Sequence, residues 1–148
     1  MSDISRKVYL SMISKAEIKD YLEEGKGFRE WGSGDLVSVR KEIRDHYRKE
    51  QKGRCVYCRL PVSLASSGNC HIEHIVPKSH YLDFMFEPLN LCVVCADCNF
   101  LKGNKSPLVK DKIVRYPRSS GAFKMFHPHF DRYGEHLKVT SNGFYRGL

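Results

Sequence analysis

The chain has 148 residues, with 25 lysines and arginines against 17 acidic residues and a formal net charge of +8. A chain of this length fits one domain with extensions, and it buries enough surface to fold without stabilising disulfide bonds. It has no apolar run long enough to span a bilayer and no secretory layout at its N-terminus, so we expect a cytoplasmic protein without a membrane partner. The basic surplus favours a polyanionic partner such as nucleic acid.

The N-terminal residues predict short elements. Residues 7–12 alternate between polar and apolar side chains and predict a short strand. Residues 14–24 place Ile18, Tyr21 and Leu22 on one helical face. The glycine-rich stretch 25–34 is typical of a loop.

A second, longer helix is predicted from Leu36 to about Gln51, with Asp35 as its N-cap and Gly53 ending it. Apolar side chains recur in it at helical spacing: Leu36, Val39, Ile43 and Tyr47. Residues 40–59 contain eight Lys or Arg and three acidic residues, a local charge of +5. This pattern fits a solvated helix face and a DNA-facing surface equally well.

Four of the six cysteines form two C-x-x-C pairs, Cys55 with Cys58 and Cys95 with Cys98. In a reducing compartment such pairs indicate a metal and not disulfides. Two pairs can close a tetrahedral four-thiolate shell, so we predict one structural zinc ion.

Cys92, with Cys95 and Cys98, also forms a C-x-x-C-x-x-C ladder, which is compatible with an iron–sulfur cluster. We rank this alternative lower because it leaves the residues between the two C-x-x-C pairs unexplained. Cys92 stands in an apolar, strand-like run, and we predict that Cys92 and Cys70 are core thiols.

The segment between the C-x-x-C pairs contains His71-Ile72-Glu73-His74, followed by Pro77. Ionisable side chains on a short apolar strand are costly unless they have partners or a chemical task. Pro77 stops the strand, so the chain bends next to Glu73 and His74.

A second group of polar residues leads into and out of the second C-x-x-C pair. Asn90 precedes that pair, and Asn99 falls in the first turn of a short helix that begins there. Lys102 shares a helical face with Asn99. The amide oxygen of Asn99 can complete an oxygen-rich magnesium site with the carboxylate of Glu73.

The C-terminal part is basic, with eight Lys or Arg against two Asp over residues 102–132. The last residues predict a hairpin with Asn142 and Gly143 in its turn. Four residues of this part could ligate a second metal, but their loose spacing and aromatic neighbours favour packing: His127, His129, Asp131 and His136.

Residues 55–107 combine C-x-x-C, HIEHIVPKS, a middle Asn-Leu and CxxCNxxKGN, and this combination resembles the HNH, or His-Me finger, nuclease family. The resemblance implies an α+β fold with a ββα-metal core over residues 54–107. Residues 1–53 would then be an N-terminal helical extension, and residues 108–148 a basic C-terminal extension with a short hairpin.

The same resemblance implies roles for individual residues. His74 would be the general base, Glu73 and Asn99 would hold a catalytic Mg²⁺ or Mn²⁺, and Asn90 would orient the loop and His74. The zinc would lie away from the chemistry. We add three lysines as expected contacts to nucleic acid, DNA in the first place: Lys78, Lys102 and Lys105.

Two positions depart from the usual family pattern. Glu73 stands where many members have Asp, and Asn99 stands where the second His of the name would be. Both keep an oxygen donor, so we expect activity to survive.

HIEHIVPKS together with CNFLKGNKSPL and the later HPHFDRYGEHL is similar to a narrower branch of HNH effectors. These effectors, of the retron or Septu type, are encoded beside an ATPase in bacterial anti-phage defence. The resemblance implies an ATPase partner. The main rival hypothesis is a catalytically silent zinc module that binds nucleic acid or a protein.

Overall fold

The computed structural model describes residues 2–139 and 145–147. Their helices are α1 (Met12–Glu23), α2 (Val37–Glu50) and α3 (Ala96–Lys102), and their strands are β1 (His71–His74), β2 (Leu91–Val94), β3 (Leu137–Val139) and β4 (Tyr145–Gly147). Short 3-10 turns cover Phe28–Glu30, Gly34–Leu36, Leu82–Phe84, Pro88–Asn90, Ser120–Ala122 and Tyr133–Glu135. The predicted α+β class is confirmed.

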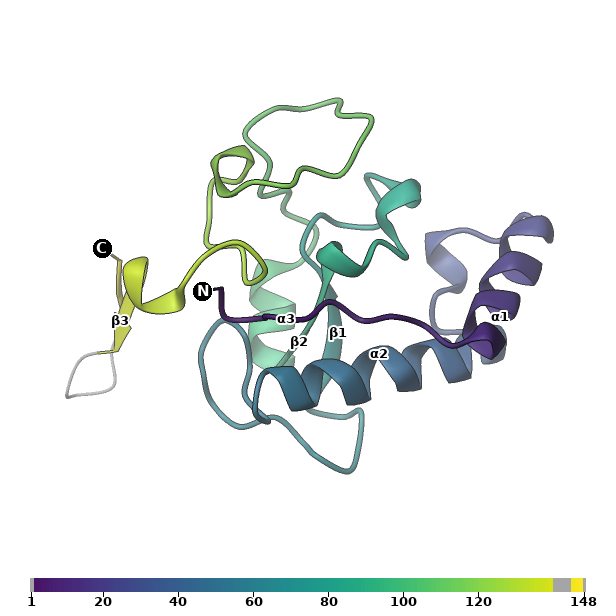
Figure 1. Ribbon diagram of the computed structural model, residues 1–148, viewed down its shortest axis with the longest axis horizontal. Helices are drawn as coiled ribbons and strands as arrows, with labels where there is room; N and C mark the ends of the chain where they lie inside the picture. The colour runs from purple at the N-terminus through teal and green to yellow at the C-terminus, as the bar shows by residue number, and fades with distance from the viewer. Residues whose placement is uncertain (1, 140–144, 148) are drawn as a thin grey trace.

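The centre of the fold is a two-stranded antiparallel sheet followed by a helix. β1 pairs with β2 so that Glu73 faces Cys92 and His74 faces Leu91 across the ladder. α3 follows β2 directly and packs beside β1, and α2 packs against both strands. Figure 1 shows α2 below the two strands, and the N-terminal segment runs just above α2, across the strands, towards α1. This ββα arrangement is the one predicted.

The predicted strand over residues 7–12 is wrong. Residues 7–11 are extended but have no ladder partner, and α1 begins at Met12, capped by the Ser11 side chain, which accepts from Ser14 N at 3.2 Å. The alternation is nevertheless real, since Val8 is buried and Tyr9 is exposed. The segment lies along α2, where Val8 N donates to a side chain, the Tyr47 hydroxyl, at 3.2 Å. The packed surface is therefore a helix face, which offers no strand edge.

The second helix forms as predicted, but its start differs. A 3-10 turn (Gly34–Leu36) leads into α2, and Asp35 does not cap it. The Asp35 carboxylate instead accepts from Lys26 Nζ and Ser33 Oγ, each at 2.9 Å. The four apolar side chains predicted for its inner face are all fully buried, and Gly53 takes a φ of +69° just beyond its end.

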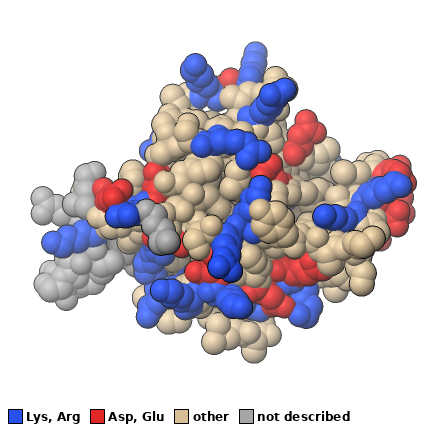
Figure 2. Space-filling view, in the orientation of Figure 1, with Lys and Arg blue, Asp and Glu red and all other residues tan. Residues whose placement is uncertain are grey.

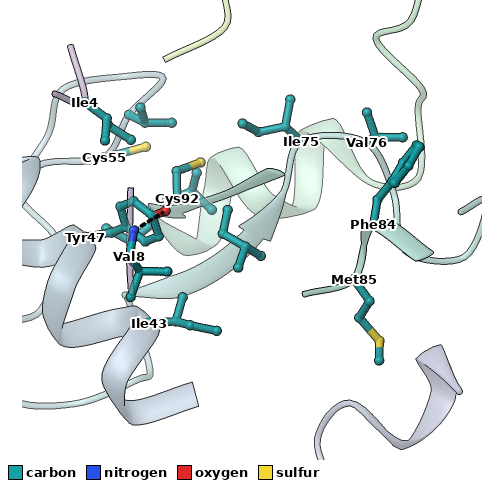
Figure 3. Close-up of a cluster of buried hydrophobic side chains, with 14 of the residues drawn as sticks. Ile4, Val8, Ile43, Tyr47, Cys55, Ile75, Val76, Phe84, Met85 and Cys92 are labelled. Carbon is teal, nitrogen blue, oxygen red and sulfur yellow. Dashed lines mark hydrogen bonds between the residues drawn. The ribbon is translucent and has the colours of Figure 1, made fainter. Parts of the chain in front are cut away.

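One hydrophobic core joins the N-terminal segment, α2 and the sheet. Ile4 and Val8 lie in the same cluster as Ile43 and Cys92 (Figure 3). At its centre the Tyr47 hydroxyl accepts from Val8 N and donates to Pro88 O at 2.7 Å. The flanking segments thus contribute to the core around the ββα unit, and the domain boundaries at 53/54 and 107/108 stay a prediction.

The free edge of β2 is closed by a side chain. Gln51 Nε2 donates to Val93 O at 2.7 Å, and Val93 N donates to Gln51 Oε1 at 2.8 Å. Gln51 therefore takes the place of a third strand at this residue pair. An unpaired buried polar group costs about 1–3 kcal/mol, so this amide supports the short sheet directly.

The C-terminal strands β3 and β4 pair antiparallel, as expected for a hairpin. Its predicted turn residues, Asn142 and Gly143, lie outside the described residues. None of the helices in the described ranges is long and apolar enough to cross a membrane.

Candidate active site and metal centres

Four cysteine sulfurs gather at the junction of three segments. Cys55 and Cys58 lie in the turn after α2, which is closed by a hydrogen bond from Cys55 N to Leu60 O at 2.8 Å. Cys95 is the N-cap of α3, and Cys98 lies one turn later. The four sulfurs are within 4.8 Å of one another, and those of Cys58 and Cys95 are 3.7 Å apart.

These distances fit zinc. With Zn–S bonds of about 2.3 Å, tetrahedral geometry places the sulfurs about 3.8 Å apart. Among the described residues this is the one cluster of His, Cys, Asp or Glu with such geometry. The predicted four-cysteine site is therefore confirmed as a site that fits structural zinc.

The other two cysteines are core thiols, as predicted. Cys70 and Cys92 are fully buried and lie outside the sulfur cluster. Burial raises the pKa of the Cys92 thiol, which keeps it protonated and poorly suited to metal binding. The ladder of Cys92, Cys95 and Cys98 therefore does not act as one ligand set.

A polar cavity of about 220 Å³ opens between the end of β1 and α3. It brings together three of the four predicted catalytic residues, Glu73, His74 and Asn99, although Asn99 is 25 positions away from His74 in sequence, and Asn90 does not line it. The remaining lining residues are Ile72, Pro77, Lys78, Gly103 and Asn104. The cavity therefore holds a carboxylate, an imidazole and an amide within one small volume.

Glu73 is buried in an ion pair with Lys102. Lys102 Nζ lies 2.9 Å from Glu73 Oε1 and also donates to His74 O at 3.1 Å. Burial raises the pKa of Glu73, and the Lys102 charge partly opposes that shift. The second carboxylate oxygen, Oε2, is buried and has no hydrogen-bond partner among the described residues. It is thus an acceptor that a bound cation would satisfy.

His74 is held in one orientation. Its Nε2 lies 3.0 Å from Met85 O, and a carbonyl can only accept, so Nε2 carries the proton and Nδ1 the lone pair. The Trp31 ring packs edge-on against the imidazole, with centroids 4.7 Å apart. Burial, assisted by the charge of Lys78, lowers the pKa of His74 to about 3. At neutral pH the imidazole is therefore uncharged.

Asn90 fixes the loop that follows β1. Its Oδ1 accepts from Val76 N at 2.7 Å, while its Nδ2 donates to Val76 O and Phe84 O, each at 3.0 Å. Asn90 O accepts from Ile75 N at 2.9 Å. This fully buried side chain thus ties the residues just after His74 to those just before Met85, the hydrogen-bond partner of His74.

The three lysines expected to contact nucleic acid differ in their surroundings. Lys78 is half-buried and lines the cavity, and burial lowers its pKa. Lys105 is exposed. The Lys102 side chain is largely buried, and in this structure its ammonium forms an ion pair with the Glu73 carboxylate. Their contacts to nucleic acid stay predictions.

Two neighbours of His74 were missed by sequence reasoning. Trp31 lies in the stretch interpreted only as a loop, and Met85 contributes its backbone carbonyl. A single tryptophan in a polar loop is only a weak sign of a functional residue. The sequence gives no sign of which backbone carbonyl will accept a hydrogen bond from a histidine. The other histidine of the segment, His71, points elsewhere, with its Nε2 3.1 Å from Gly68 O.

His127, His129 and Asp131 are buried and pack as predicted, whereas His136 is partly exposed. His127 Nε2 lies 2.9 Å from the Tyr116 hydroxyl, and His129 Nε2 lies 2.8 Å from Leu91 O. His127 N donates to Asp131 Oδ2 at 2.7 Å. His129 therefore anchors the C-terminal segment to β2, and within the described part of the chain these side chains form no metal-type cluster.

Comparison with protein families gives one match. Residues 55–108 match the family described as HNH endonuclease. Comparison with curated proteins finds no match for the chain. The matched segment contains both C-x-x-C pairs, β1, β2 and α3. Residues 55–108 therefore form a domain of the HNH endonuclease family, and this family implies phosphodiester hydrolysis.

The zinc site leads to a direct prediction. The purified protein should contain about one zinc ion, and Cys58→Ser or Cys95→Ser should lose it and largely unfold, because a structural zinc contributes about 10–16 kcal/mol of folding free energy. Cys70→Ser and Cys92→Ser are matched controls that should stay folded with zinc bound. Elemental analysis and circular dichroism measure both. Iron in place of zinc, or equal zinc in all four variants, would contradict the assignment.

Proposed function

We propose that the chain is a metal-dependent endonuclease that cuts DNA in the cavity between β1 and α3. The observation that carries this proposal is the shared cavity of Glu73, His74 and Asn99 inside the HNH endonuclease domain. The net charge of +8 supports a nucleic-acid substrate. Figure 2 shows Lys and Arg side chains over the upper loops and along α2, where acidic side chains are interspersed.

The donors in the cavity suit a hard divalent cation. Glu73 Oε2 is a buried oxygen without a partner, and the Asn99 amide offers a second oxygen in the same cavity. We propose that these two residues hold Mg²⁺ or Mn²⁺. Such an ion, when bound, stabilises negative charge on the phosphate and on the leaving 3′ oxygen.

His74 is proposed as the general base. Its Nδ1 carries the lone pair, because Nε2–H is held by Met85 O, and Nδ1 would take a proton from the attacking water. A base works best with a pKa near the working pH, and the pKa of about 3 belongs to the protein without substrate. An entering phosphate would bring negative charge next to His74 and raise its pKa, and a divalent cation on Glu73 would oppose that rise. The products would carry 5′-phosphate and 3′-hydroxyl ends.

Two further groups would support the reaction without entering it. Asn90 is proposed as a positioning residue, since its three side-chain hydrogen bonds hold the loop on both sides of the His74 imidazole. Lys78 and Lys105 are proposed to contact backbone phosphates, which positions a strand but does not read its sequence.

We also propose that the protein is located in the cytoplasm. All six of its cysteines are free, as is typical of proteins in this reducing compartment.

One observation favours the rival hypothesis of a silent zinc module. The Lys102 ammonium already neutralises Glu73, at 2.9 Å from Oε1, as a stand-in for a cation. This rival predicts that the protein binds nucleic acid or a partner protein but never cuts nucleic acid. The variants of His74 described below decide between the two.

We also propose that the nuclease acts in bacterial anti-phage defence together with an ATPase. Its support is the resemblance of residues 71–79, 98–108 and 127–137 to that branch of HNH effectors. Co-expression with a neighbouring ATPase should give a stable complex by size-exclusion chromatography, with cleavage activity that differs from that of the free chain. A chain that stays monomeric and equally active beside every candidate ATPase would remove this idea.

The sharpest prediction concerns His74. His74→Ala should lower the cleavage rate by about 10²–10⁴-fold, the usual cost of losing a general base. The loss should fall on the chemical step, so DNA affinity and zinc content should not change. Single-turnover cleavage of a labelled duplex, with binding measured separately, separates the two effects. His74→Gln keeps more of the side-chain volume beside Trp31 and should be equally slow.

His71→Ala is the matched control, because it removes the other imidazole of the same strand. It lies outside the cavity and should retain most of the activity. Glu73→Gln and Asn99→Ala should also stop cleavage, but through weaker Mg²⁺ binding that excess metal partly restores. If His71→Ala is inactive while His74→Ala cuts normally, the base is misassigned. If both cut normally, the nuclease mechanism proposed for this cavity fails.

A further inference from the structure

Three arginines follow one another at four-residue intervals along α2: Arg40, Arg44 and Arg48. This spacing places them on one helix face, where like charges repel and lower the stability of the helix. The outer two are neutralised or held by neighbours. Arg40 Nη1 donates to Trp31 O and Ser33 O, each at 2.7 Å.

Arg48 is likewise occupied. Its Nη1 lies 3.3 Å from Asp45 Oδ1, and its Nη2 donates to Ser66 O. Asp45 is shared with Lys41, whose ammonium lies 2.5 Å from Oδ2. The Asp45 carboxylate is therefore already shared by two cations.

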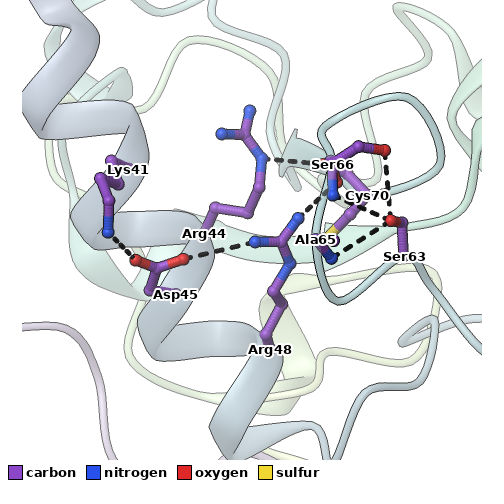
Figure 4. A network of polar contacts seen from close by, with 8 residues as sticks. All are labelled: Lys41, Arg44, Asp45, Arg48, Ser63, Ala65, Ser66 and Cys70. Carbon is purple, nitrogen blue, oxygen red and sulfur yellow. Dashed lines mark hydrogen bonds and ion pairs between the residues drawn. The ribbon is translucent and has the colours of Figure 1, made fainter.

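Arg44 is different, as Figure 4 shows. Its Nε donates to Cys70 O at 2.9 Å, which fixes the orientation of the half-buried guanidinium. Its two Nη groups have no hydrogen-bond or ion-pair partner among the described residues. A guanidinium held by Nε presents its remaining N–H groups as a planar fork, which matches two oxygens of one phosphate.

The fork lies beside the strand that carries the candidate active site. Cys70 directly precedes β1, and His74 ends it. At the far end Arg40 holds the backbone of Trp31, whose ring contacts His74. With about 3.3 Å per residue in a strand, Cys70 and His74 are about 13 Å apart. A nucleic-acid strand covers that length in a few nucleotides, at about 3.4 Å of rise each.

We propose that Arg44 binds a backbone phosphate of the nucleic-acid substrate, a few nucleotides from the bond that is cut. This inference rests on the proposed function and adds a substrate-binding residue outside the HNH endonuclease domain. Arg44 is a binding and not a catalytic residue, because it lies at the opposite end of β1 from His74. The repulsion between the three arginines is tolerated in the free protein and relieved when the phosphate arrives.

The test is equilibrium binding of a short DNA duplex without divalent metal, so that no cleavage occurs, at salt concentrations between 50 and 200 mM. Arg44→Met should bind about tenfold more weakly, the typical effect of losing a charged hydrogen bond. Its plot of log affinity against log salt should lose about one unit of slope, because one phosphate contact is gone. Arg44→Lys should keep the slope and still bind more weakly, since the charge stays and the fork is lost.

Lys41→Met is the matched control. It removes the same charge from the same helix, one turn away, but its ammonium is already paired with Asp45. Its affinity and slope should stay close to those of the parent. Melting temperature and zinc content check that each variant is folded. If Arg44→Met is not folded, the binding of Arg44→Lys compared with that of the parent tests the proposal. If Arg44 and Lys41 variants weaken binding equally, only the overall charge matters and the proposed contact is wrong. A parent protein that binds no nucleic acid would instead overturn the proposed function itself.

Discussion

The closure of the chain by four cysteine sulfurs is the constraint on which the rest of this structure depends. A two-stranded sheet with four residues in each strand is marginal in water by itself. Here the first cysteine pair lies ahead of β1, and the second begins α3 directly after β2. Zinc bound to the four thiolates would hold the two ends of the ββα unit together. The strands can then be short and still carry reacting groups.

That closure allows polar residues to be buried where a short sheet would otherwise exclude them. Glu73 and His74 are adjacent on β1, yet each has its own partner, Lys102 for the carboxylate and Met85 O for the imidazole. An isolated buried charge is strongly unfavourable, so the Glu73–Lys102 pair keeps the carboxylate compatible with the fold. Among the described residues, Nδ1 of His74 and Oε2 of Glu73 have no hydrogen-bond partner, so both atoms are available for the proposed chemistry. Preorganised groups of this kind need little rearrangement when the substrate binds.

Sequence reasoning succeeded where the chemistry is local or repeats at a known spacing. The two C-x-x-C pairs predicted the metal ligands, and the helical spacing of Val39, Ile43 and Tyr47 predicted the buried face of α2. It failed where a tertiary partner decides the outcome. The alternation over residues 7–12 indicated a strand, but the packed surface there is a helix face.

The same limit applies inside the candidate site. The expected contact of Lys102 with nucleic acid stays a prediction, but the sequence did not indicate that its ammonium pairs with the buried carboxylate of Glu73. Asp35 has the chemistry of a helix cap, and two nearby donors, Lys26 and Ser33, take its carboxylate instead. The Glu73–Lys102 and Lys26–Asp35 pairs cannot be read from helical spacing, because each joins separate segments of the chain.

The central claim is that the cavity of Glu73, His74 and Asn99 cuts nucleic acid with the help of a divalent cation. The most direct measurement incubates zinc-loaded protein with supercoiled plasmid and, in parallel, with RNA, while Mg²⁺ or Mn²⁺ is raised from zero. We predict no cleavage without added metal, a rise that saturates with metal, and preference for the plasmid, with the zinc content constant throughout. Cleavage at full rate without added metal, or no cleavage of either substrate at any metal concentration, would contradict the account.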